Sequence, residues 1–178
     1  MSCDDLSILC VTRAETCVRE LLEQLAHDVH SLGAELVLFA DGSMAVYNRR
    51  GALFRNMYNL VEGVSNGFIE SILDHAIAAT SRPYILRIDD DESLSPGLLS
   101  WLASGAYRSA NHWKFNRAHL IHDAHTYANT PLLWPDPQTR LSTRELSGNR
   151  HMIHAASPYG PGELAPDGVI LLHHKFLV

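Results

Sequence analysis

Cysteine is scarce in this 178-residue chain, and its three copies, Cys3, Cys10 and Cys17, all lie near the N-terminus. An odd count without a signal peptide argues against a disulfide framework. Cys10 lies in an apolar run, where a cysteine is expected to act as a small buried hydrophobe. We therefore expect a reduced, cytoplasmic protein.

Three further features are missing. No apolar run reaches the roughly 18 residues of a membrane span, and no basic-plus-apolar targeting segment is visible. The formal charge of -6 disfavours charge-driven binding of nucleic acid, although a local basic patch stays open. The sequence also lacks a glycine-rich P-loop, so it does not support phosphoryl transfer of the Walker type.

The first half of the sequence alternates strand-like and helix-like segments. A hydrophobic content of 46% suits a soluble globular domain. Thr12 and Glu15 have the spacing of a capping box, and Ser95-Pro96 has the signature of a helix start. This order predicts an α/β fold with a doubly wound, mostly parallel sheet. We expect strands at 6–11, 35–40 and 83–88, and helices around 18–29, at 65–80 and from 96.

The second half is richer in Pro, His, Trp and Arg, and its expected strands are short. They lie at 112–115, 139–142, 150–154 and 169–174. We expect a smaller, mixed or antiparallel half (111–178) that completes one domain with the first half (1–110).

Three consecutive aspartates, Asp89, Asp90 and Asp91, follow the third expected strand. Like charges this close raise one another's pKa, and a divalent cation such as Mn²⁺ or Mg²⁺ removes that penalty. The alternative is helix capping, but Ser95 already supplies a cap. Asp41 ends the second strand, and carboxyl ends of parallel strands meet at one edge. We therefore predict a metal and nucleotide site that includes Asp41.

The chain resembles the family 2, GT-A type glycosyltransferases. The similar segments are Leu6–Arg13 (LSILCVTR), Glu35–Ser43 (ELVLFADGS) and Tyr84–Leu99 (YILRIDDDESLSPGLL), the last with an Asp-x-Asp motif. A narrower resemblance, to the branch that includes the lipopolysaccharide-core glucosyltransferases, rests on Trp113–Ile121 (WKFNRAHLI), Trp134–Leu141 (WPDPQTRL), His151–His154 and Gly168–His174 (GVILLHH).

The resemblance implies a single GT-A-like domain, with a nucleotide-sugar-binding half at 1–110 and an acceptor-side half at 111–178. It also implies roles for particular residues. Asp41 would hydrogen-bond the nucleotide base, unless it is only a turn residue. Asp89 would contact ribose or metal, and Asp91 would ligate the metal. A late histidine, His173 or His174, would complete the metal shell or meet the diphosphate. Strand alternation places these two on opposite faces, so only one can point into the site.

Further substrate contacts are implied for Asp90, Arg13, Arg117, Arg140 and Trp134. Arginine suits planar, bidentate recognition of phosphate, although Arg13 could equally be a surface charge. Trp134 could stack on a sugar or base, or it could belong to the core.

The catalytic base departs from the pattern of that branch. A Glu usually follows the His of the later strand, whereas Ala155 follows His154 here. Asp136 and His154 are therefore the candidate catalytic residues, with Asp123 as a further option. Asp123 and Asp136 could instead be turn residues. Only four residues follow His174, so we expect a minimal form or a fragment with a reduced acceptor side.

These features predict an inverting, metal-dependent glycosyltransferase. A single displacement would move a sugar from a nucleotide-sugar donor, a UDP-sugar by family expectation, to a carbohydrate or other hydroxyl acceptor. Two alternatives remain: a sugar-nucleotide-binding module without turnover, and a nucleotidyltransferase.

Overall fold

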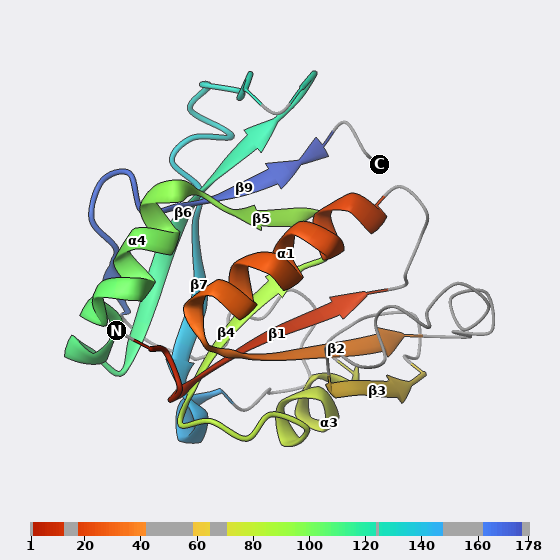
Figure 1. The fold of residues 1–178 in the computed structure, drawn as a ribbon. Coiled ribbons are helices and arrows are strands. Elements are labelled where there is room, and N and C mark those ends of the chain that lie inside the picture. Colours follow the sequence, from red (N-terminus) through yellow and green to blue (C-terminus); the bar gives the residue numbers. More distant parts are fainter. Residues whose placement is uncertain are drawn as a thin grey trace.

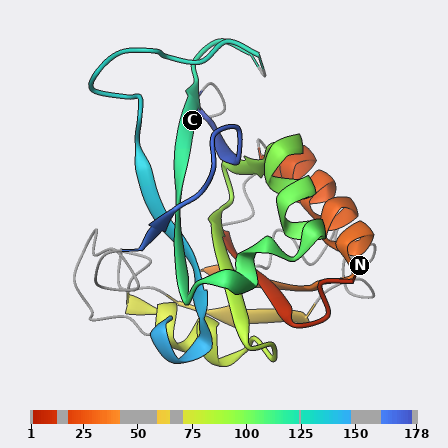
Figure 2. The same cartoon turned by 90° about the vertical axis from the view of Figure 1, so that its left-hand side faces the viewer.

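The computed structural model describes residues 2–12, 18–41, 59–64, 71–123, 125–147 and 162–175. These residues form one twisted sheet with helices on both faces (Figures 1 and 2). The strands are β1 (Leu6–Thr12), β2 (Glu35–Asp41), β3 (Asn59–Gly63), β4 (Tyr84–Asp89), β5 (Glu92–Leu94), β6 (His112–Leu120), β7 (Pro137–Thr143), β8 (Glu163–Leu164) and β9 (Ile170–His174). The helices are α1 (Arg19–Leu32), α3 (Leu73–Ala78) and α4 (Pro96–Ser104), with 3-10 turns at Ala106–Ser109 and Arg144–Leu146.

The strand order within the described residues is β3-β2-β1-β4-β7-β6-β9-β5, with β8 beside β6. The pairs from β3 to β4 are parallel, whereas β7 runs antiparallel to both of its neighbours. Strand β9 is parallel to β6 and antiparallel to β5. The expected α/β fold, parallel in its first half and mixed in its second, is confirmed.

Strand β1 is buried on both faces, which explains its unbroken apolar sequence. Alternate residues point to opposite sides of a strand. Ile8 and Cys10 accordingly join a core with α1 and α4, while Leu9 and Val11 join a second core with residues of α3. Figure 1 shows α1 lying across the face that carries the first core. The expected burial of Cys10 is thus confirmed.

Helix α4 begins as its sequence predicts. The Ser95 hydroxyl accepts a hydrogen bond from the Leu98 amide, and Pro96 occupies the first helical turn. Thr12 is the last residue of β1, and its hydroxyl bonds the Asp90 carboxylate. Glu15 lies outside the described residues, so the capping box expected at Thr12 and Glu15 stays a prediction, and α1 is described from Arg19.

Other boundaries differ in length. Strand β6 runs five residues beyond the expected end at Phe115, because its far half pairs with β9. The helix expected at 65–80 is described only from 71 onward, where α3 spans Leu73–Ala78. The strand expected at 150–154 lies outside the described residues. No described helix has the length and apolar character needed to cross a membrane.

Candidate functional site

Strands β1, β2 and β4 end side by side at one edge of the sheet. Thr12 pairs with Ala40 of β2, and Val11 pairs with Asp89 of β4. Asp41 therefore lies two strands away from Asp89 and two residues further along its strand, or roughly 12 Å away in backbone position. This confirms that the two acidic segments share an edge. The Asp41 side chain, Arg13 and His154 lie outside what the structure describes.

The three adjacent aspartates do not share one point in space. Asp89 still belongs to β4, whereas Asp90 and Asp91 form the turn into β5. The turn separates their carboxylates, and each finds its own protein partner. These partners are Arg140 for Asp89, Thr12 for Asp90 and His173 for Asp91.

Asp89 is held by a buried arginine. Arg140 Nη2 lies 2.6 Å from Asp89 Oδ2 and 2.8 Å from Glu92 Oε1, and the Arg140 side chain is only 3% exposed. Burial raises the pKa of Asp89, but the nearby guanidinium groups, Arg140 foremost, outweigh it and bring that pKa below its ordinary value. The Arg140 guanidinium thus already binds two carboxylates. Arg140 is therefore better placed to orient Asp89 than to contact a phosphate directly.

Glu92 is a site residue that the sequence reasoning missed. Its side chain is fully buried, and its carboxylate also accepts from Arg117 Nη1 at 3.2 Å and from the Asp89 amide at 3.0 Å. Burial, together with the negative charge of Asp89, raises the pKa of Glu92, although Arg140 and Arg117 act to lower it. The signal in the sequence was a fourth acid directly after three aspartates, which reads equally well as a solvated turn.

Asp91 and His173 form the pair that best fits a divalent cation. His173 Nε2 lies 2.8 Å from Asp91 Oδ2. Two adjacent ligands of an octahedral ion at about 2.1 Å lie roughly 3 Å apart, so this spacing suits shared coordination. No group of three or more His, Cys, Asp or Glu side chains within the described ranges could hold a metal. Water and substrate phosphates would supply the remaining ligands, as Mg²⁺ sites commonly require.

His174 turns to a different partner. Its Nε2 lies 2.8 Å from Ser93 Oγ, and its amide donates to the Asp91 carbonyl. Burial lowers the pKa of the His174 ring. Of the two candidate histidines, His173 is the one whose ring meets Asp91.

Behind His173 lies a second histidine, His119, which the sequence reasoning named only within a motif. The two Nδ1 atoms are 2.9 Å apart, and His119 Nε2 lies 3.0 Å from Asp136 Oδ2. Strand pairing sets this contact, because His119 of β6 stands directly opposite His173 of β9. Burial, then the charge of Arg117, lowers the pKa of His119.

Asp136, a candidate base, accepts from three side chains. Arg117 Nε lies 2.9 Å and His119 Nε2 3.0 Å from Oδ2, and Gln138 Nε2 lies 2.6 Å from Oδ1. Burial works to raise the pKa of Asp136, but these donors lower it overall. A carboxylate with both oxygens engaged is a weaker proton acceptor, so its contacts favour a positioning role.

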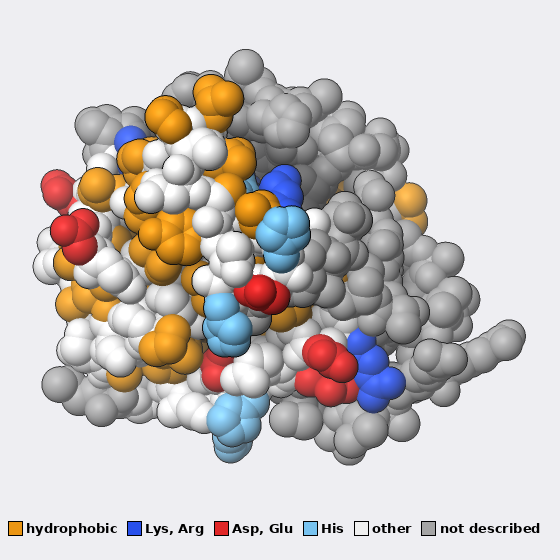
Figure 3. Space-filling model, turned by 90° about the horizontal axis from the view of Figure 1, so that it is seen from above, with side chains coloured by type: hydrophobic (Ala, Val, Ile, Leu, Met, Phe, Trp, Pro, Cys, Tyr) orange, Lys and Arg blue, Asp and Glu red, His pale blue; other side chains and the backbone are white. Residues whose placement is uncertain are grey.

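Charged side chains gather at this site. Among the residues that the structure describes, five carboxylates lie with three guanidinium groups. Carboxylate oxygens are ligands that a divalent cation such as Mg²⁺ prefers. The members are Asp89, Asp90, Asp91, Glu92 and Asp136 with Arg87, Arg117 and Arg140. From above, histidine and carboxylate side chains lie beside one another on the described surface (Figure 3).

Trp134 has its ring contact with Tyr127, which is not a member of this cluster. It follows the exposed segment after β6, and its ring lies 5.7 Å from that of Tyr127, which is 45% exposed. Asp123 is exposed and accepts from the His125 and Thr126 amides, so the structure gives it the turn role.

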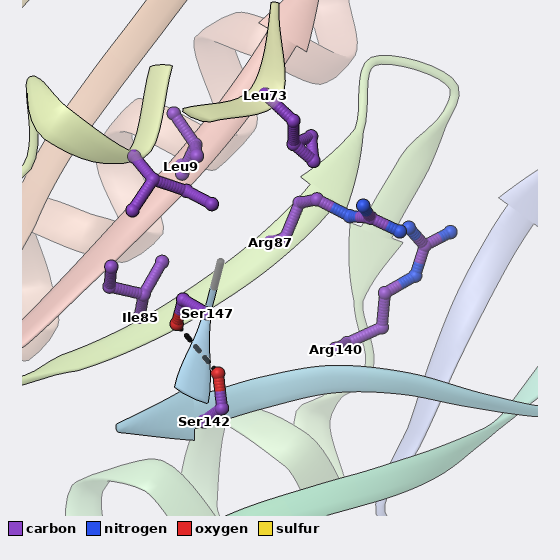
Figure 4. A pocket seen from close by; sticks show the side chains of 8 residues that line it. Leu9, Leu73, Ile85, Arg87, Arg140, Ser142 and Ser147 are labelled. Atoms are coloured by element: carbon purple, nitrogen blue, oxygen red, sulfur yellow. Dashed lines mark hydrogen bonds between the residues drawn. The ribbon is translucent and has the colours of Figure 1, made fainter. Parts of the chain in front are cut away.

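A small cavity lies on the α3 side of the sheet, next to Arg140. It measures about 10 Å³, room for roughly one water molecule, and cannot hold a nucleotide sugar. Figure 4 shows Arg87 and Arg140 directed toward each other at one side of it and apolar side chains at the other. This cavity therefore lies beside Arg140 but is not a donor site.

Known proteins share this fold without close sequence similarity. No protein-family model and no curated protein matches the sequence. S. aureus TarS (1-349) in complex with UDP-GlcNAc superposes with a TM-score of 0.64 at 14% identity, over 98% of this chain and 59% of TarS. The mannosyltransferase PcManGT from Pyrobaculum calidifontis, in complex with GDP-Man and Mn²⁺, gives 0.63 at 14% identity, over 95% and 56%. Glucosyl-3-phosphoglycerate synthase from Mycobacterium tuberculosis, with Mn²⁺, UDP and phosphoglyceric acid, gives 0.56 at 17% identity, over 81% and 57%.

These neighbours are GT-A type glycosyltransferases, and the expected GT-A-like fold is confirmed. The chain spans between 56% and 59% of the length of these three solved chains, and 37% of a longer solved TarS chain. The narrower resemblance to the lipopolysaccharide-core branch stays a prediction.

Proposed function

We propose that this chain is a metal-dependent, inverting glycosyltransferase that moves a sugar from a nucleotide-sugar donor to an acceptor hydroxyl. The observation that carries the proposal is the Asp91–His173 pair at the carboxyl edge of a GT-A sheet, beside the carboxylates of Asp89, Asp90 and Glu92. The neighbours were solved with UDP-GlcNAc, UDP or GDP-Man, and two of them with Mn²⁺. A UDP-sugar is the first donor to test.

We propose a role for each site residue from its contacts. Asp91 and His173 would hold Mn²⁺ or Mg²⁺, with His174 as the other histidine candidate. A bound divalent cation there supplies charge stabilisation to the departing diphosphate. Asp41, two strands away, would bind the nucleotide base, and Asp89, braced by Arg140, would face the ribose. Asp90 ties the turn to β1 through Thr12.

The proton acceptor is proposed among Asp136 and His154. The acceptor hydroxyl loses its proton as it attacks the sugar carbon, and the bond to the diphosphate breaks in the same displacement. Because three donors reduce the basicity of Asp136, His154 is the stronger candidate. Arg13 and Trp134 stay proposed substrate contacts.

The test is nucleotide affinity measured by calorimetry with and without Mn²⁺. We expect Mn²⁺ to tighten binding of UDP or GDP, and Asp91→Ala to abolish that gain. Asp167→Ala is the matched control, because Asp167 is exposed in the turn before β9. Undiminished nucleotide binding by the wild-type protein in excess EDTA would contradict the metal dependence.

A second candidate function is a sugar-nucleotide-binding module without turnover. The occupied oxygens of Asp136 favour it. Incubation with UDP-glucose, UDP-GlcNAc or GDP-mannose separates the two functions, because only an enzyme releases free nucleoside diphosphate. The first sugar anomer released, followed by proton NMR, reports inversion or retention. If the Asp91→Ala variant still released nucleoside diphosphate, that result would count against Asp91 as a metal ligand needed for turnover.

A further inference from the structure

A continuous line of hydrogen bonds runs from the proposed metal site into the sheet. Asp91, His173, His119 and Asp136 are joined by contacts of 2.8, 2.9 and 3.0 Å. The two imidazole side chains are only 6% and 7% exposed. Arg117 and Gln138 fix the far end of the line by bonding Asp136.

The line holds one contact too many for two neutral rings. Each of the three contacts needs one hydrogen, and a neutral imidazole carries only one N–H. Two rings therefore supply two hydrogens for three contacts. If both Nε2 atoms donated to their carboxylates, the two Nδ1 lone pairs would face each other at 2.9 Å without a hydrogen.

If Asp91 and His173 held a divalent cation, the surplus contact would disappear. Metal ligation requires the lone pair of His173 Nε2, so the hydrogen of His173 must sit on Nδ1. That N–H then donates to His119 Nδ1, and the single hydrogen of His119 sits on Nε2 and donates to Asp136. Two hydrogens now fill two contacts, and every ring nitrogen has a partner.

We propose that His119 is a positioning residue that fixes His173 in the tautomer able to ligate the metal. Asp136 orients His119 in turn, so this carboxylate acts on the metal site indirectly, through the rings of His119 and His173. The inference rests on the proposed function, because it takes the metal between Asp91 and His173 as given. Its geometric basis is the direct pairing of His119 with His173 across β6 and β9.

The tautomers can be measured directly. We expect ring ¹⁵N shifts of histidine-labelled wild-type protein, saturated with Mg²⁺ and UDP or GDP, to show His173 carrying its hydrogen on Nδ1. His119 should carry its hydrogen on Nε2. A metal-loaded His119 with its hydrogen on Nδ1 would overturn the proposal, since it could not then accept from His173.

Metal affinity supplies the second measurement. Electron paramagnetic resonance of free Mn²⁺, titrated with and without UDP, should show His119→Ala weakening Mn²⁺ binding about 10- to 100-fold. The matched control, His122→Ala, changes an exposed histidine two residues beyond β6 and should bind as the wild type does.

The outcomes separate this proposal from the proposed function. A wild-type protein that binds Mn²⁺, together with a folded His119→Ala of equal affinity, overturns only the role of His119. A wild-type protein without Mn²⁺ affinity overturns both. If circular dichroism shows that His119→Ala does not fold, the wild-type tautomers decide.

Discussion

Arg140 links two acidic residues in the interior, and its removal tests the electrostatic account of the site. The change is Arg140→Met, which keeps an unbranched apolar stem but removes the charge. Glu92 would stay fully buried beside Arg117, and Asp89 would lose its two hydrogen bonds from Arg140. Removing one member of a buried ion pair costs about 3–5 kcal/mol, because the remaining charge is left unpaired.

For a chain of this length, that loss corresponds to a fall in melting temperature of roughly 6–20 °C. Urea unfolding followed by circular dichroism measures the free energy, provided that the slope of the transition is unchanged. Arg19→Met is the control, because the Arg19–Glu23 pair is about half exposed and should contribute under about 1 kcal/mol.

The loss should depend on pH. Burial already raises the pKa of Glu92, and the loss of Arg140 should raise it further. A carboxyl whose pKa is higher in the folded state loses stabilisation as pH rises from its ordinary value through the raised one. Arg140→Met should therefore be more destabilised at pH 8 than at pH 5, and Glu92→Gln should restore part of the loss. A change below about 1 kcal/mol at both pH values would refute the reasoning.

Two further predictions concern the N-cap of α4 and the Asp5–Arg108 ion pair. Ser95→Ala should lower the free energy of unfolding by about 1 kcal/mol in urea melts, because it removes the cap of α4. Ser95→Asp should keep most of the capping contribution, because aspartate is also a good N-cap residue. Asp5→Asn should cost about 1–2 kcal/mol at pH 7, because Asp5 bonds Arg108 at 2.6 Å. Arg108 lowers the pKa of Asp5, although burial opposes it, so this contribution is present above the ordinary pKa and lost as pH falls through the lowered one. The wild type and Asp5→Asn should thus converge toward pH 2, and an equal gap at pH 7 and pH 2 would contradict the ion-pair role.

The elements that could be predicted from sequence are those set by local signals. Strand β1 and helix α4 follow from an apolar run and from a Ser-Pro start, and both depend on residues close in the chain. The shared edge of Asp41 and Asp89 follows from the same reasoning, since parallel strands align their carboxyl ends.

The rest depends on pairings between distant segments. Strand β5 is three residues long and exists because β9, nearly 80 residues later in the chain, pairs with it. That pairing buries Glu92, which reads as a turn residue by itself. His119 meets His173 only because β6 and β9 are neighbours, a fact that strand periodicity cannot supply. Thr12 likewise gains a partner that no local pattern predicts, because its hydroxyl bonds the Asp90 carboxylate 78 residues later in the chain.

The triple aspartate shows how these levels combine. Adjacent like charges predicted a shared cation, because joint ionisation is unfavourable when nothing separates them. The turn after β4 reduces that repulsion by sending each carboxylate to a different strand: Asp89 toward β7, Asp90 toward β1 and Asp91 toward β9. Arg140 and Thr12 donate to Asp89 and Asp90, whereas His173 carries a ring nitrogen that can exchange its hydrogen for a metal bond. These contacts favour Asp91 as the carboxylate that would hold the proposed cation. In that proposal Asp89 and Asp90 fix the turn that positions it.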